Sequence, residues 1–200
     1  MSGEYQTIVG IATAKHVVKK SRFFGEASAV NSHDAVKKFV ADVRSRIRQA
    51  THYCYAYCIG SGNKKLEYAT DAGEPIHSAG PPILTAIRAT ELSNTIIVVA
   101  RYYGGTNLGI GGLIRAYGTC ARACLKNATL ETRTFYHNLH VSVPYSHIGA
   151  VVTLCKRLGG QVTNIEYDPT PNIAIQIQQK ELKTFKAQLQ SIGITKTELQ

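Results

Sequence analysis

The sequence lacks long apolar segments and any sign of a secretion signal. No apolar run approaches the roughly 20 residues that a membrane-spanning helix needs. The N-terminus, MSGEYQTIVG, has no basic stretch followed by an apolar one. We therefore expect a cytoplasmic protein with no membrane partner.

Common catalytic and nucleotide-binding motifs are also missing. The patterns HExxH, GxSxG and CxxC do not occur in the chain. A glycine-rich stretch begins at Gly104, but Ile110 stands where a Walker A motif needs lysine. Ile114 occupies the last glycine position of a GxGxxG motif. The sequence therefore predicts no cofactor.

Cysteine is scarce, and the five cysteines form an odd set that we expect to be reduced in a cytoplasmic chain. On a strand, Cys54 and Cys58 would lie about 13 Å apart, too far to share a zinc ion through Zn–S bonds of ~2.3 Å. Cys120 and Cys124 fall on the apolar stripe of a predicted helix, which indicates core residues. No metal site is predicted.

Acidic residues are outnumbered, with 13 Asp and Glu against 23 Lys and Arg and a net charge of +10. The excess is uneven: 17 − 9 gives +8 for residues 1–134, and 6 − 4 gives +2 for residues 135–200. Such a basic region favours an acidic partner, either RNA, the ribosome or an acidic protein surface. No preference for DNA is predicted, and the alternative is that the charge serves solubility alone.

A strand, a glycine-rich loop and a helix follow one another between 95 and 127. This order brings backbone N–H groups and a helix N-terminus together, which favours an anion. The alternative is that the glycines allow positive φ and close packing where strand becomes helix. The residues of the candidate ligand or partner surface are Asp71, Gly73, Glu74, Arg101, Tyr102, Gly104, Gly105, Gly109, Gly111, Gly112 and Arg115.

Arg101 and Arg115 bracket this loop. A guanidinium on each side would suit a phosphate or a carboxylate. Alternatively, each arginine forms a salt bridge with Asp71 or Glu74 and ties the loops together. The sequence leaves both interpretations open.

The segments before the loop are predicted as strands at 5–14 and 22–30, joined by a basic connection, and a helix at 33–49. Lys37, Arg44 and Arg48 form a basic edge beside the apolar stripe of this helix. Strand 51–59 follows, and it places three tyrosines on one face for core packing or for stacking on bases. Residues 61–63 are predicted as a turn.

One loop gathers side chains that could carry acid–base chemistry. Asp71, Glu74, His77 and Ser78 lie in it, and His52 lies on a strand that could be nearby. Carboxylate and histidine together could act as general acid and base. The alternative is that Asp71 and Glu74 accept backbone N–H bonds and hold a turn.

A polar stretch at 128–138 is predicted to link two domains, 1–134 and 135–200. Beyond it, the pattern is strand, helix, strand, strand, helix, strand. This βαββαβ order is that of a ferredoxin-like domain.

Five motifs, THYCYAY, DAGEP, SAGPPIL, VVARYYGG and LGIGGLIRAYG, occur in this order between 51 and 118. They resemble the Impact/YigZ family. The resemblance implies an α+β protein, in which an N-terminal domain like domain 2 of ribosomal protein S5 precedes a ferredoxin-like domain. It also implies that the pair is similar to domains IV and V of elongation factor G.

Eukaryotic members of this family regulate translation and associate with ribosomes, and nucleic-acid or ribosome binding is the usual suggestion for bacterial members. This chain departs from the family pattern at Ala72, Ile76-His77, Pro81 and Asn107. The last two replace an arginine and a lysine, so the anion site loses two cations.

We therefore predict a non-catalytic binding protein linked to translation regulation. It would contact RNA, the ribosome or a ribosome-associated protein through its basic surface and glycine-rich loop. The alternative is an enzyme that acts on a small phosphorylated or acidic substrate at the 71–80 and 101–115 loops. Nothing in the sequence predicts an oligomeric state.

Overall fold

The computed structural model describes residues 3–60, 65–194 and 197–199. The chain divides into two compact units. One comprises Gln6–Thr132, and the other comprises Met1–Tyr5 with Arg133–Gln200. The turn predicted at 61–63 lies outside the described residues.

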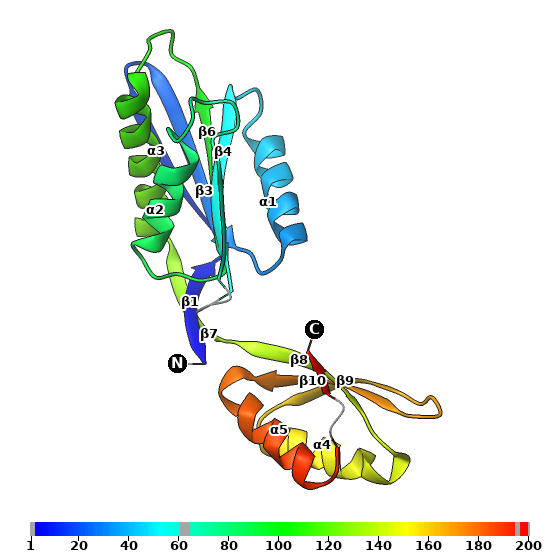
Figure 1. The fold of residues 1–200 in the computed structure, drawn as a ribbon. Coiled ribbons are helices and arrows are strands. Elements are labelled where there is room, and N and C mark those ends of the chain that lie inside the picture. Colours follow the sequence, from blue (N-terminus) through cyan, green and yellow to red (C-terminus); the bar gives the residue numbers. More distant parts are fainter. Residues whose placement is uncertain (1–2, 61–64, 195–196, 200) are drawn as a thin grey trace. The chain divides into compact units, whose positions relative to one another are not determined.

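The N-terminal unit is a five-stranded antiparallel sheet with helices on both faces (Figure 1). Helix α1 covers one face, and α2 and α3 cover the other. The strands, in sheet order, are β2 (Ile11–Val18), β3 (Ser21–Ala29), β6 (Thr95–Tyr102), β4 (His52–Ile59) and β5 (Leu66–Thr70). The helices are α1 (His33–Arg46), α2 (Gly80–Arg88) and α3 (Gly109–Lys126).

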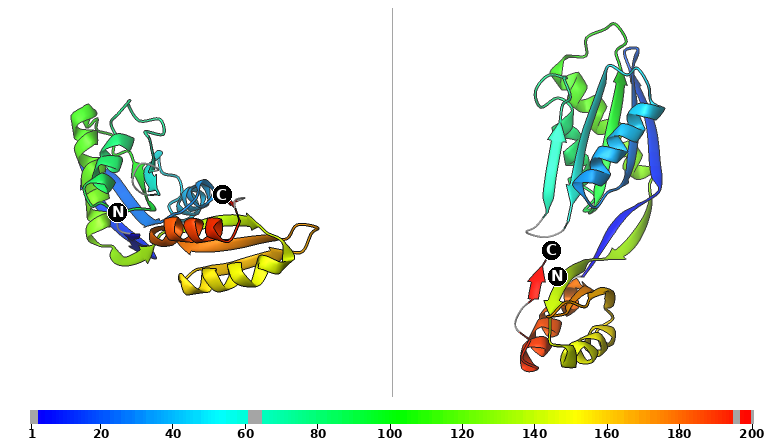
Figure 2. Two further views of the ribbon diagram at one scale, coloured as in Figure 1. Left: turned by 60° about the horizontal axis from the view of Figure 1, so that its bottom comes forward. Right: turned by 90° about the vertical axis from the view of Figure 1, so that its right-hand side faces the viewer.

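Strand β6 is central and apolar because both of its faces are covered. Ile97 and Val99 pack into the core under α2 and α3, whereas Ile96 and Val98 pack into the core under α1. The right-hand view of Figure 2 shows α1 lying across the face of the sheet. Tyr57 of β4 is buried in the α1 core, so part of the predicted tyrosine face serves packing.

The basic connection expected between the first two long strands is much shorter than predicted. Strand β2 continues to Val18 and pairs with Ser21, so only Lys19 and Lys20 form the turn. Both have positive φ, 44° and 67°. Alternating exposure along β2 explains the difference, since an edge strand tolerates outward-pointing basic residues.

The polar stretch at 128–138 is also not the loop that we expected. Strands β7 (Thr129–Thr134) and β8 (Tyr136–Ser142) occupy it, and β7 pairs with β1 (Glu4–Val9) in a two-stranded sheet. The side chains are polar because such a ribbon has little core to fill, while its backbone groups still pair. The boundary between the two units falls within β1, after Tyr5, and within β7, after Thr132.

The C-terminal unit follows the predicted βαββαβ order. Its elements are β8, α4 (Ile148–Arg157), β9 (Gln161–Glu166), β10 (Asn172–Gln178), α5 (Leu182–Ser191) and β11 (Thr197–Leu199). The sheet order is β11-β8-β10-β9. Both helices lie on one face of this sheet (Figure 1). The apolar residues of β8 and β10 form the core with Phe185 and Leu189 of α5.

Candidate functional site

The 71–79 loop is held in shape by one carboxylate. Asp71 Oδ1 accepts hydrogen bonds from the backbone N–H groups of Ala79 and Gly80, and Oδ2 accepts one from His77, all at 2.8 Å. Burial raises the pKa of Asp71, but these backbone donors outweigh it and hold the pKa below its ordinary value. Asp71 therefore fixes the loop and the start of α2.

A buried ion pair joins this loop to the central strand. Arg101 Nη1 lies 2.7 Å from Glu74 Oε1, and the side chains are only 7% and 3% exposed. The Tyr117 hydroxyl donates to the same oxygen at 2.7 Å. Burial raises the pKa of Tyr117, so this hydroxyl remains a donor. Glu74 is thus committed to the protein interior.

Between the two loops lies a cavity of about 540 Å³, here called the loop cavity. Its walls come from the start of β4, the 71–79 loop and the segment that runs from β6 into α3. Residues that matter for its chemistry are His52, Glu74, Arg101, Tyr103, Asn107 and Gly109. The 71–80 and 101–115 loops therefore converge, and His52 is among the lining residues.

Hydrogen bonds define the states of two polar groups in the cavity wall. His52 Nδ1 lies 2.9 Å from the carbonyl oxygen of Ala72, which can only accept. The neutral ring therefore carries its proton on Nδ1 and keeps a lone pair on Nε2. Asn107 Oδ1 accepts from the Tyr103 hydroxyl at 3.1 Å, so the amide NH₂ of Asn107 remains a donor.

Close packing explains one glycine of the loop, and backbone conformation explains two more. A Cβ atom at Gly104 would lie 2.1 Å from the carbonyl carbon of Lys20, so no side chain fits there. Gly105 and Gly109 have φ of 77° and 68°. These three glycines thus have a structural reason, which is one of the two interpretations that the sequence left open.

A cationic surface with aromatic rings lies on the α1 side of the sheet. The Arg22 guanidinium is 5.1 Å from the Tyr102 ring centre, and Lys15 Nζ is 5.4 Å from that of Phe24. Arg22, Phe24, Tyr102 and Arg48 line one hollow of about 430 Å³. We call Lys15, Arg22, Phe24, Arg48 and Tyr102 the cationic aromatic surface.

The three residues of the predicted basic edge of α1 make different contacts and do not form one surface. Lys37 forms an exposed ion pair with Asp34 at 3.7 Å. Arg44 stacks on the Tyr53 ring, 5.2 Å from its centre. Only Arg48 joins the cationic aromatic surface.

Arg115 and His77 lie apart from the loop cavity. Both line a hollow of about 390 Å³ over α2 and α3, which also contains Arg122. Arg101 and Arg115 therefore do not form the two-sided clamp considered above. His77 and His52 likewise line different hollows.

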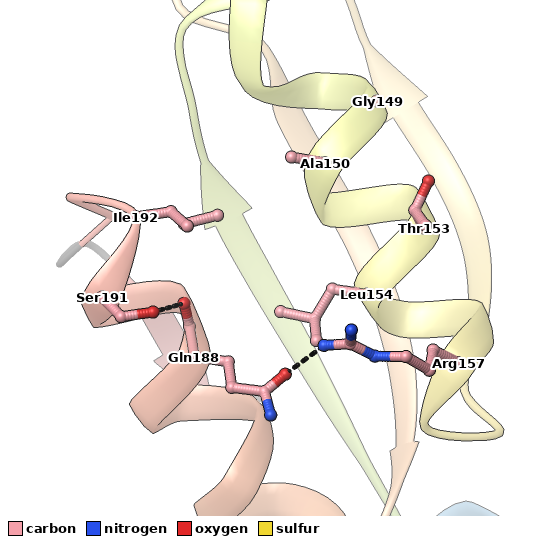
Figure 3. Close-up of a pocket in the computed structure, with 8 residues that line it drawn as sticks. All are labelled: Gly149, Ala150, Thr153, Leu154, Arg157, Gln188, Ser191 and Ile192. Atoms are coloured by element: carbon pink, nitrogen blue, oxygen red, sulfur yellow. Dashed lines mark hydrogen bonds between the residues drawn. The ribbon is translucent and has the colours of Figure 1, made fainter.

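The C-terminal unit has a cavity of about 400 Å³ between α4 and α5. Figure 3 shows Arg157 of α4 and Gln188 of α5 joined across it by a hydrogen bond. Arg157 is the one charged residue in its lining, and that bond engages the guanidinium. Among the described residues, its lining contains no carboxylate and no histidine, unlike that of the loop cavity.

The described part of the chain gives little support for a metal site, a membrane-spanning helix or a nucleophilic thiol. No group of three or more metal-ligating side chains occurs among residues 3–60, 65–194 and 197–199. In the same part of the chain, no helix is long and apolar enough to cross a membrane. Burial raises the pKa of Cys54 to about 12, so this thiol is not a ready nucleophile.

Sequence reasoning missed several residues of these surfaces. Arg22 and Phe24 alternate on β3, and their partner Tyr102 lies across the sheet on β6. Tyr103 and Asn107 lie inside the glycine-rich motif. Their spacing in the sequence, an aromatic residue followed by an amide, was the only indication that both could line one site. Cross-strand neighbours far apart in sequence leave no such signal.

Comparison with known proteins supplies the family. The model of the Impact N-terminal domain matches residues 19–125. The IMPACT family member YvyE of Bacillus subtilis is 31% identical over 185 residues, which cover 92% of this chain and 85% of YvyE. The IMPACT family member YigZ of Escherichia coli is 29% identical over 88% of this chain and 87% of its own.

A solved structure agrees with the family match. The crystal structure of a hypothetical protein is 26% identical and superposes with a TM-score of 0.77, covering 98% of this chain and 96% of the other. The family predicted from the sequence motifs is thereby confirmed. The chain belongs to the Impact family.

Proposed function

We propose that this protein is a non-catalytic RNA-binding protein linked to the regulation of translation. The observation that carries the proposal is the cationic aromatic surface. Exposed Arg22 and Arg48 can neutralise phosphates, and Arg22 lies over the half-buried ring of Tyr102, a cation–aromatic arrangement suited to a nucleic-acid backbone. The Impact family resemblance, through its translation-regulating members, points to the same partners.

The turn between β2 and β3 adds to the argument. Lys19 and Lys20 both have positive φ, a conformation that normally favours asparagine and glycine in two-residue hairpins. The left-handed conformation costs roughly 1–2 kcal/mol for each such residue. Two exposed lysines at strained positions are better explained by binding an acidic partner than by folding.

We also propose a fold type for each domain and a cellular location for the protein. Residues 1–134 would form an Impact-like domain similar to domain 2 of ribosomal protein S5. Residues 135–200 would form a ferredoxin-like domain resembling domain V of elongation factor G. The four-stranded sheet order β11-β8-β10-β9 supports the second assignment. The protein would act in the cytoplasm on ribosomes or ribosome-associated proteins.

An enzyme acting on a small phosphorylated or acidic substrate is the second candidate. One observation favours it, since the two loops converge on a cavity lined by His52. Against it, Asp71 is bound to three backbone N–H groups and Glu74 is paired with Arg101. The carboxylates that acid–base catalysis would need serve the structure instead.

Co-sedimentation with purified ribosomes and subunits over a salt series, with and without nuclease, tests the proposal. RNA contact predicts affinity that falls steeply with salt, with a log–log slope of about −0.7 for each single-stranded phosphate neutralised. It also predicts loss of binding after nuclease treatment. Salt-sensitive binding that survives nuclease would favour a protein partner. Absence of binding at low salt would contradict the proposal.

A further inference from the structure

We propose that the hollow over α2 and α3 is a docking site for an acidic segment of a partner protein, with an apolar side chain of that segment inserted into it. The two helices lie beside each other on one face of the sheet (Figure 1). We call this hollow of about 390 Å³ the α2–α3 hollow. The site goes beyond the proposed RNA contact, because the described residues that line it do not line the hollow of the cationic aromatic surface.

Apolar groups form much of the lining of the α2–α3 hollow. Pro81 and Pro82 come from the first turn of α2, and Ile114 comes from α3. The prolines are half-buried, and Ile114 is 41% exposed although it is a large apolar residue. Gly118 keeps the space between them open, since a Cβ atom there would lie 3.7 Å from Pro82 Cβ. These groups offer a contact for an apolar side chain of a partner.

Basic side chains lie among these apolar groups. His77, Arg115 and Arg122 line the α2–α3 hollow, and no carboxylate is found among the described residues of its lining. Arg115 is exposed and forms no hydrogen bond or ion pair with another described residue. Arg122 donates to Thr119 Oγ1 at 3.1 Å, which uses one of its five N–H donors. Both guanidinium groups can therefore bind carboxylates.

Carboxylates of the neighbouring elements are engaged elsewhere. Asp71 accepts hydrogen bonds from three backbone N–H groups. Glu67 of β5 pairs with Arg88, the last residue of α2. The positive charge of the α2–α3 hollow thus has no counter-charge in its own lining, and charge complementarity selects an acidic occupant.

The lining favours a protein segment over RNA. Bases stack on aromatic rings, and among the described residues no tyrosine or phenylalanine lines this hollow. Apolar anchors flanked by charged residues are typical of amphipathic peptides that dock in grooves between helices. The volume of about 390 Å³ lies within the range of roughly 300–1,000 Å³ that is usual for binding pockets, so a branched side chain such as leucine fits.

Nuclear magnetic resonance titration of the full chain with a ten-residue peptide of alternating glutamate and leucine pairs tests the proposal. This peptide should shift the backbone amide signals of Thr85, Ile114 and Gly118, with a dissociation constant on the order of 100 μM that rises with salt. One control peptide has serine for leucine, and the other has glutamine for glutamate. Each should bind at least about fivefold more weakly, because the first lacks the apolar anchor and the second lacks the charge.

Variants on α3 locate the peptide. Ile114→Ser and Arg115→Glu should each weaken its binding about fivefold, since the first removes an apolar contact and the second reverses a charge. Ile110→Ser and Lys126→Glu make the same changes at exposed positions of α3 outside the α2–α3 hollow. They should leave the dissociation constant unaltered.

Two further measurements separate this site from the RNA surface. The Arg22→Glu/Arg48→Glu variant should bind the acidic peptide normally, and Arg115→Glu should bind ribosomes normally. A ten-nucleotide oligouridylate should leave the amide signals of Ile114 and Gly118 unshifted. Failure of the wild type to bind ribosomes would contradict the RNA contact alone, because the peptide titration does not depend on it.

Three results of the peptide experiments would overturn the proposal. They are an absence of peptide binding at about 1 mM, equal binding of the control peptides, and equal effects of the variants inside and outside the α2–α3 hollow. Oligouridylate shifts at Ile114 and Gly118 would have the same consequence, because they would assign the hollow to RNA.

Discussion

Asp71 shows how one residue can determine a functional loop. Because its folded-state pKa is lowered, its stabilisation is present above the unfolded value of about 4 and is lost as pH falls through the folded pKa. Asp71→Ala should lower the free energy of unfolding by about 1–3 kcal/mol at neutral pH, since buried N–H groups lose their acceptor. Urea unfolding measures the loss.

The pH dependence provides the control. The difference in stability between the wild type and Asp71→Asn should shrink as the pH falls below the folded pKa, because the wild-type carboxyl is then neutral too. Asp34→Asn alters an exposed carboxylate and should show a much smaller difference. A pH-independent difference at position 71 would contradict the assigned role.

The ion pair of Glu74 and Arg101 yields a second prediction at this scale. Glu74→Gln leaves a buried guanidinium without its counter-charge and should cost about 3–5 kcal/mol. Glu67→Gln breaks a more exposed pair with Arg88 and should cost less than about 1 kcal/mol. Denaturant unfolding compares the two variants, and equal losses would show that the buried pair is not the structural link described.

At the scale of elements, variants of the hairpin of β2 and β3 should change the free energy of unfolding and the RNA affinity in opposite directions. Lys19→Asn/Lys20→Gly supplies the residues that this turn prefers and should raise the free energy of unfolding by about 1–2 kcal/mol. The same variant should bind RNA more weakly and with a shallower salt dependence, because two cations are lost. Thermal unfolding and RNA titration measure the two effects.

The matched control for this hairpin is Lys37→Asn/Lys38→Asn on α1. It removes the same charge from a helix whose lysines form exposed ion pairs, so it should bring no gain in stability. A stabilised hairpin variant that retains full RNA affinity would show that Lys19 and Lys20 have no role in binding.

Elements with their own periodic or continuous pattern were predictable from the sequence. The apolar run of β6 and the stripe of α1 placed both correctly, although α1 ends at Arg46 and not at 49. Strand β7 was missed, because a polar strand in a two-stranded ribbon looks like a linker. The turn at Lys19 was missed because it lacks the usual glycine or asparagine.

The candidate site was predictable only in part, for a related reason. Asp71 as a turn holder and Arg101 paired with Glu74 were both among the alternatives that the sequence left open. Arg22 and Tyr102 became neighbours only through pairing of β3 with β6. Proximity across a sheet depends on strand order, which local patterns do not encode.

For the whole molecule, the central claim is that the excess positive charge of the N-terminal region binds RNA through one surface. Residues 1–134 have a net charge of +8 from 17 − 9, and part of it gathers around Phe24 and Tyr102. Arg22→Glu/Arg48→Glu reverses two of these cations. Arg122→Glu/Lys126→Glu makes the same change on α3, on the opposite face of the sheet (Figure 1).

The most direct test is to measure ribosome co-sedimentation of these two variants and the wild type across the salt series. We predict that Arg22→Glu/Arg48→Glu weakens binding at least about tenfold and flattens the salt slope by about 2, while the α3 variant binds like the wild type. Equal weakening of both variants would reduce the interaction to net charge and contradict a specific RNA-binding surface.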